Sequence, residues 1–321
     1  MPAETTAART GVIHDLGYQR YDGPRFGRAQ IVRALAWHSF RAAFGFGRGA
    51  KAKIIPVIAL VALCLPAVVN AFAMSRGNAR LVSYDAYQPV LRDLVMTVFV
   101  AVQAPEMVSR DLRSRVLPLY FSRPMKTIDY PVAKFLGFGA ACLVMMEVPI
   151  LLLYAGTIVN VHGGSAVWAQ TKQLIPGLLA GLLWAVVLTA ISLFLASLTG
   201  RRAFATGAVA IFFLATYSMS QILLQVETHA AQARFFAARG PGAGPVPLDQ
   251  VPVTMGEKVS GLFSPFTLID GTRTWLGSPT TADQVPKNLG AFGAVYALVL
   301  LVVVALCLTG LAARYRKASL S

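Results

Sequence analysis

Long segments without any charged side chain are the feature that most limits what this chain can fold into. Four of them, at positions 54–74, 174–198, 203–225 and 289–313, contain no Asp, Glu, Lys or Arg. An α-helix rises about 1.5 Å per residue, so about 20 apolar residues cross the ~30 Å hydrocarbon core of a bilayer. Charged residues make up 13% of the 321 residues, whereas soluble domains contain about 25%. We therefore predict an all-α, polytopic membrane protein.

Two more segments bring the predicted number of membrane-spanning helices to six. Residues 131–159 form a long apolar run with Glu147 in its interior, and residues 88–107 form a weaker run. Arg92 and Asp93 interrupt the weaker run near its outer end, where we expect their side chains to snorkel to the interface. Glu106 lies near its inner end, where a structural hydrogen bond and a gating role are both open.

The distribution of basic residues predicts the orientation in the membrane. Twenty of the 29 Lys and Arg residues precede residue 54, lie in the connections at 105–134 and 199–202, or follow residue 313, while eight lie on the other side. Because cytoplasmic loops are enriched in Lys and Arg, both termini are predicted to be cytoplasmic. We expect the net charge of +15 to favour the anionic headgroups of a lipid bilayer. Nucleic acid is not an expected partner, since no soluble basic domain is recognisable.

The chain is predicted to have three parts. Residues 1–27 form a leader, residues 28–50 an interfacial helix, and residues 51–321 a six-helix transmembrane domain whose external connection covers 226–288. In residues 28–46, apolar side chains such as Ile31, Val32 and Leu35 share one face of an amphipathic helix. This helix lies in the cytoplasmic membrane interface or packs on another protein. In the external connection, residues 255–275 are expected to form an external or partly re-entrant element on the helix tops.

No cofactor or metal site is predicted. The three Cys and four His residues form no C-x-x-C or H-E-x-x-H spacing. A phosphate loop requires G-x-x-x-x-G-K-[ST], and the nearest stretch, from Gly45 to Lys51, fails that spacing. An intramembrane enzyme would need paired catalytic groups, and Glu147 has no evident His or Asp partner in the apolar runs. The chain is therefore not expected to be an enzyme.

The connection at 104–134 is the most specific segment of the sequence. It combines a Glu at the end of the second predicted helix, a short charged helix, a turn with proline, and a Lys that begins the third helix. These features are carried by Glu106, Arg110, Asp111, residues 117–120, Ser122, Arg123, Pro124 and Lys134. Here, and in the six-helix layout, the sequence resembles the permease subunits of type 2 ATP-binding-cassette (ABC) exporters. Residues 17–24 resemble the leaders of actinobacterial members.

The resemblance implies a permease of the bacterial cytoplasmic membrane that exports its substrate. It would pair with a second permease subunit, identical or different, and with two copies of a separate ATPase subunit, which hydrolyse the ATP. A segment that we call the coupling loop would dock on the ATPase; its candidate residues are Glu106, Arg110, Asp111, Arg113, Arg115, Tyr120 and Pro124. The alternative for this loop is a solvated basic segment that only sets the membrane topology. The alternative function for the whole chain is that of a non-transporting membrane scaffold or sensor.

Glu147 is the remaining candidate for a functional residue. A carboxylate inside a membrane-spanning helix is costly, so it is a functional candidate by default. Glu147 either lines a substrate path or satisfies a contact between helices. Gly177 and Gly181 have the small-xxx-small spacing that permits close helix approach.

Overall fold

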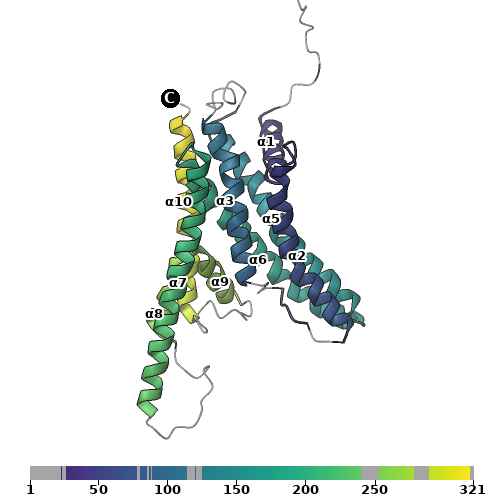
Figure 1. Ribbon diagram of the computed structural model, residues 1–321, viewed down its shortest axis with the longest axis vertical. Helices are drawn as coiled ribbons and strands as arrows, with labels where there is room; N and C mark the ends of the chain where they lie inside the picture. Colours follow the sequence, from purple (N-terminus) through teal and green to yellow (C-terminus); the bar gives the residue numbers. More distant parts are fainter. Residues whose placement is uncertain are drawn as a thin grey trace, which may run out of the picture.

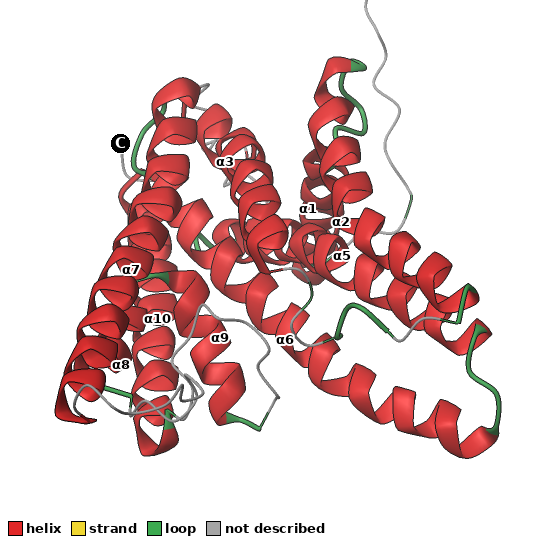
Figure 2. Ribbon diagram, turned by 60° about the horizontal axis from the view of Figure 1, so that its bottom comes forward, coloured by secondary structure: helices red, strands yellow, loops and turns green. Residues whose placement is uncertain are grey.

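In the part of the chain that the structure describes, helices and their connections make up the whole fold (Figures 1 and 2). The computed structural model describes residues 23, 27–77, 80–84, 87, 89–113, 120, 125–239, 253–277 and 289–318. The α-helices, in chain order, are α1 (Arg28–Ala43), α2 (Lys51–Ser75), α3 (Pro89–Arg113), α5 (Asp129–Val159), α6 (Gly164–Ser197), α7 (Arg202–Arg239), α8 (Met255–Ser260), α9 (Pro265–Trp275) and α10 (Gly293–Ala318). Two 3₁₀ turns, η2 (Gly261–Phe263) and η3 (Gly290–Phe292), precede α9 and α10.

Five of these helices are long and apolar enough to cross a membrane, which fits a multi-pass membrane protein. They are Lys51–Ser75, Asp129–Val159, Gly164–Ser197, Arg202–Ala238 and Gly290–Lys317. The helix α3 has 25 residues, but Arg92, Asp93 and Glu106 make it more polar than the other five. That α3 also crosses the membrane, which would complete the predicted six, stays a prediction.

The first and last described helices reach the same end of the bundle. Figure 1 shows α1 and the C-terminal end of α10 at the top, and α2, α3, α5, α6, α7 and α10 running along the long axis. We call this the basic end, because α1, the start of α2, the start of α7 and the end of α10 bring many Lys and Arg residues there. At the opposite end, α7 extends beyond its neighbours, with α8 beside it (Figure 1).

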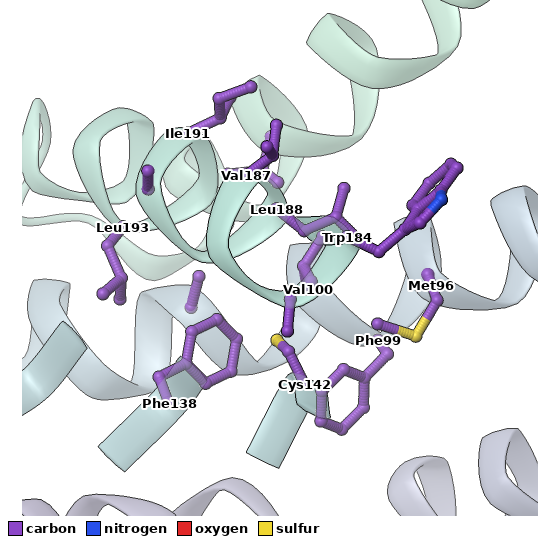
Figure 3. Close-up of a cluster of buried hydrophobic side chains, with 14 of the residues drawn as sticks. Met96, Phe99, Val100, Phe138, Cys142, Trp184, Val187, Leu188, Ile191 and Leu193 are labelled. Carbon is purple, nitrogen blue, oxygen red and sulfur yellow. The ribbon is translucent and has the colours of Figure 1, made fainter. Parts of the chain in front are cut away.

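The helix α3 lies in the middle of the core. Met96, Phe99 and Val100, which follow the spacing of one helical face, are fully buried. They meet side chains from α5 and α6 in the cluster of Figure 3, where Phe99 stacks on Phe138 with ring centroids 6.1 Å apart. Because neighbouring helices cover α3 on all but one face, its charged residues can find partners inside the bundle, as buried charges require.

A helix, α1, is present where the amphipathic helix was predicted, and its buried residues pack on the same chain; that it lies in the membrane interface stays a prediction. Leu35, Ser39 and Ala43 are its buried residues, and α5 is its main neighbour. The two backbones meet at Gly137, where an added Cβ would lie 2.3 Å from the carbonyl oxygen of Ala36. The glycine therefore permits the contact, and the alternative in which this face serves another protein is not needed to explain its pattern.

Several predicted boundaries differ from those observed. The helix α6 begins at Gly164 rather than at residue 174, and α7 continues to Arg239 rather than ending at residue 225. The first residues of the predicted external connection, 226–239, thus form the second part of α7. At 1.5 Å per residue, a helix of 38 residues is much longer than a bilayer core is thick. The second part of α7 can therefore be polar and still helical, so its polarity does not mark the C-terminal end of the helix.

The predicted element at 255–275 consists of α8, η2 and α9. The Oγ atom of Ser264 accepts a hydrogen bond from the backbone N–H of Phe266 at 3.3 Å, and Pro265 starts α9. The residues of α9 from Pro265 through Arg273 are buried. They pack against α6, α7 and α10, and Figure 1 places α9 beside α7 and α10, above their lower ends.

Candidate functional site

The coupling-loop residues of α3 are tied to the start of α5 by an ion pair. The Nζ atom of Lys134 lies 2.9 Å from Oδ2 of Asp111, and the hydroxyl of Tyr130 donates to the same carboxylate oxygen. The side chain of Lys134 is 6% exposed and that of Asp111 is 17% exposed. The carboxylate of Asp111, which was predicted to contact a partner ATPase, is thus engaged by α5. We call Asp111, Tyr130 and Lys134 the α3–α5 clamp.

Two tyrosines extend the clamp to neighbouring segments. The ring of Tyr130 lies 4.8 Å from the ring of Tyr315 in α10 and 5.4 Å from that of Tyr120. A second ion pair joins Arg28 of α1 to Asp129, one residue before Tyr130; Nε of Arg28 donates to Oδ2 of Asp129 at 2.5 Å. The start of α5 therefore contacts α1, α3 and α10 within one helical turn.

Glu106 is held between two arginines from other helices. Its carboxylate lies 2.9 Å from Nη2 of Arg48, in the segment before α2, and pairs with Arg202 at the start of α7. One turn later in α3, the hydroxyl of Ser109 donates to the carbonyl oxygen of Ala196 at 2.9 Å. Of the two readings left open for Glu106, the observed contacts agree with a structural bond at the entry to the loop.

The other predicted coupling-loop residues are only partly described. Arg113, the last residue of α3, is exposed. Arg110 lies within the same helix, while Arg115 and Pro124 lie outside the described residues. The described part of the loop thus divides into an inward-facing set, Asp111 and Tyr120, and the exposed Arg113.

A buried cluster of four charged residues lies toward the other end of α3. Nε of Arg92 donates to Asp93 at 3.0 Å, and its Nη2 donates to Oδ2 of Asp270 in α9 at 3.1 Å. Arg273, one turn after Asp270, lies 3.4 Å from Oδ1 of that aspartate. All four side chains are at most 5% exposed. The expectation that Arg92 and Asp93 snorkel to the interface is therefore wrong, because α9 supplies opposite charges inside the bundle.

Aromatic rings continue this cluster across three helices. The guanidinium of Arg92 lies 3.8 Å from the ring centroid of Trp184 in α6. Trp184 stacks on Phe266 of α9 at 5.3 Å, and Phe266 stacks on Phe213 of α7 at 5.4 Å. The delocalised guanidinium suits such stacking. The stack and the ion pairs together fix α9 against α3, α6 and α7.

Sequence reasoning missed Asp270 and Arg273. Both fall in residues 255–275, for which only an external or partly re-entrant element was predicted. A usable signal was present: Asp and Arg three residues apart share a helix face, and the run at 88–107 carries the complementary pair Arg92 and Asp93. Two such pairs in apolar segments of one chain favour mutual neutralisation over exposure of either pair to lipid.

Glu147 lies against Gly181, the second glycine of the small-xxx-small pair. A Cβ added at Gly181 would lie 2.4 Å from Oε1 of Glu147. Its Oε2 atom is buried and has no hydrogen-bond partner among the described residues. Gly181 thus leaves room for a carboxylate from α5. Gly177 leaves room for Tyr84, because a Cβ added at Gly177 would lie 3.1 Å from the Cβ of Tyr84.

A small cavity lies next to this contact. Its volume is about 20 Å³, and Arg92, Trp184, Gly181, Tyr84 and Tyr87 are among the residues that line it. Such a volume holds about one water molecule. The described cavity beside Gly181 is thus too small for a larger ligand, while the half-buried side chain of Glu147 contacts α6 at Gly181. Whether Glu147 also lines a substrate path stays a prediction.

The described residues contain no group of three His, Cys, Asp or Glu side chains arranged to hold a metal ion. Comparison with known proteins adds no identification: no family model matches the chain, and no curated protein matches it.

Proposed function

We propose that this chain is the permease subunit of a type 2 ABC exporter in the bacterial cytoplasmic membrane. In this proposal α3 is the sixth spanning helix, and both termini and the basic end face the cytoplasm. A second permease subunit and two copies of a separate ATPase complete the transporter, and the ATPase hydrolyses the ATP.

The observation that carries the proposal is the α3–α5 clamp. A loop that receives force from an ATPase must pass it to the helices instead of absorbing it by bending. The bond of Asp111 to Lys134 and Tyr130 joins the helix before the coupling loop to the helix after it. The ring of Tyr130 also touches that of Tyr315 in α10. Displacement of the loop would therefore move α3, α5 and α10 together.

The same geometry supports different roles for residues of the coupling loop in this proposal. Asp111 is a positioning residue, because its carboxylate is engaged by Lys134 within the chain. Arg113 is exposed and is the described loop residue that suits contact with a partner, since arginine is common at protein interfaces. Arg115, two residues further along, is expected to act with it.

The test is co-expression of the chain with ABC ATPase subunits from the same genome, followed by affinity purification. Replacing Arg113 and Arg115 with Ala should reduce the amount of ATPase that co-purifies. Replacing Lys134 with Met should leave association intact and should lower substrate-stimulated ATP hydrolysis, because the loop would still dock but would transmit less motion. Arg33→Ala is the matched control, since it removes a charge from an exposed position of α1 at the same end.

Two results would count against the proposal. If no ABC ATPase associates with the chain and ATP has no effect on it, a non-transporting scaffold or sensor is the better reading. If Arg113→Ala with Arg115→Ala associates as well as the Arg33→Ala control does, the loop has no docking role.

A further inference from the structure

A cleft at the basic end carries an excess of positive charge. It has a volume of about 300 Å³ and lies where the end of α3 meets the segments that precede α2 and α7. Its polar lining comes from Arg48, Glu106, Ser109, Arg113 and Arg202. Three guanidinium groups thus face one carboxylate, so the cleft carries two uncompensated positive charges. A volume of this size falls at the lower limit of ordinary ligand sites, about 300 Å³.

The carboxylate of Glu106 arranges the arginines without using all their donors. It lies between Arg48, at 2.9 Å, and Arg202. A guanidinium has five N–H donors, and a carboxylate can engage about two of them in a bidentate pair. Each arginine therefore retains donors for a second acceptor. Arg113 adds a third guanidinium that stands outside the ion pairs of Glu106.

The chemistry of the lining selects a tetrahedral oxyanion. Arginine binds phosphate through two parallel N–H···O bonds, and the cleft lies at the basic end, beside the start of α7 and the segment before α2. Basic pockets between membrane helices on the cytoplasmic side bind phosphate-bearing lipid headgroups. We propose that this cleft binds a phosphate group, supplied by the headgroup of an anionic phospholipid. This inference rests on the orientation proposed above, in which the basic end faces the cytoplasm, but it does not require that the chain transports a substrate.

The experiment is native mass spectrometry of the full chain in detergent, titrated with phosphatidylglycerol or with phosphatidylcholine. We expect one phosphatidylglycerol to bind saturably and more tightly than phosphatidylcholine. Arg113→Gln should weaken its binding about fivefold, because one basic residue near an anionic surface contributes roughly 1 kcal/mol. Arg33→Gln is the control: Arg33 is exposed, donates to Gln30 within α1 and does not line the cleft, so binding should be unchanged.

A second arm distinguishes lipid from free phosphate. Inorganic phosphate at millimolar concentration should fail to displace phosphatidylglycerol if the acyl chains contribute to binding. If inorganic phosphate displaces phosphatidylglycerol from the unmodified chain but not from Arg113→Gln, the cleft binds phosphate as proposed but takes it from a soluble ligand, and the lipid assignment is overturned. Arg48→Gln supplies an independent variant, and circular dichroism checks that each variant keeps its helical content. Equal affinity for the two lipids, or equal weakening by Arg33→Gln and Arg113→Gln, would overturn the proposal.

Discussion

Replacing Asp270 with Leu removes the acceptor at the centre of the buried charge cluster. Asp270 accepts from Arg92 at 3.1 Å, lies 3.4 Å from Arg273, and its side chain is 1% exposed. Without it, two buried arginines share the single carboxylate of Asp93. Two unit charges 4 Å apart interact by about 4 kcal/mol at an effective dielectric constant of about 20. Breaking a buried pair from one side typically costs about 3–5 kcal/mol, and we expect a loss of this size.

The assay is reversible unfolding of the purified chain in mixed micelles, followed by circular dichroism as the fraction of denaturing detergent rises. A double-mutant cycle with Arg92→Met isolates the interaction. Because the double variant leaves Asp93 with Arg273 and no excess charge, its loss of stability should be smaller than the sum of the two single losses. Arg28→Gln is the comparison variant, since the pair of Arg28 with Asp129 is half exposed on the arginine side and such pairs contribute little.

A loss below about 1 kcal/mol for Asp270→Leu, with additive effects of Arg92→Met, would refute this reasoning. That result would mean that the four charged side chains are hydrated in the native protein. It would also remove the explanation for the buried position of α9.

Three further changes test close contacts and one titration. Gly181→Ala should destabilise the chain, because the new Cβ would lie 2.4 Å from the carboxylate of Glu147; adding Glu147→Ala should restore the midpoint of detergent unfolding. Gly137→Ala should destabilise the chain more than Gly181→Ala does, because the new Cβ would meet the backbone carbonyl of Ala36. No second substitution that shortens a side chain should restore the stability, and faster proteolysis at α1 would report that α1 is displaced. Burial raises the pKa of Glu257, so the folded state binds the proton of this carboxyl more tightly than the unfolded state does. The folded state therefore loses stability as the pH rises from the unfolded pKa through the folded pKa. Glu257→Gln should raise the unfolding midpoint at neutral pH and leave it unchanged at low pH.

The sequence predicts the long helices because their apolar runs match the thickness of a bilayer, a constraint that acts on each segment by itself. The five most apolar helices were all expected, and residues 88–107 were expected to be helical, as α3 is. The continuation of α7 to Arg239 was not expected, because its second part is more polar than its first; this part contacts α8. Local polarity marks where a helix leaves an apolar environment, which need not be where its backbone hydrogen bonds end.

The candidate site was predictable only in part, since its contacts join distant segments. Glu106, Asp111 and Lys134 were recognised as charged positions, yet their partners Arg48, Arg202 and Tyr130 depend on how the helices pack. Arg92 and Asp93 lie near the outer end of the predicted second helix, and that position suggested that both side chains snorkel to the membrane interface. The second acceptor, Asp270, lies 178 residues further along the chain, beyond the reach of any local pattern.

This separation has a consequence for the order in which the protein assembles. Arg92 and Asp93 leave the ribosome long before Asp270 and Arg273, so in a nascent chain that ends before α9 this ion pair lacks the further carboxylate and guanidinium that complete the cluster. If α3 crosses the membrane as proposed, its N-terminal half would stay in contact with water or with the insertion machinery until α9 has been synthesised and has packed against it. Chains cut before residue 265 should therefore leave α3 accessible to water-soluble thiol reagents at an introduced cysteine, whereas the full-length chain protects it.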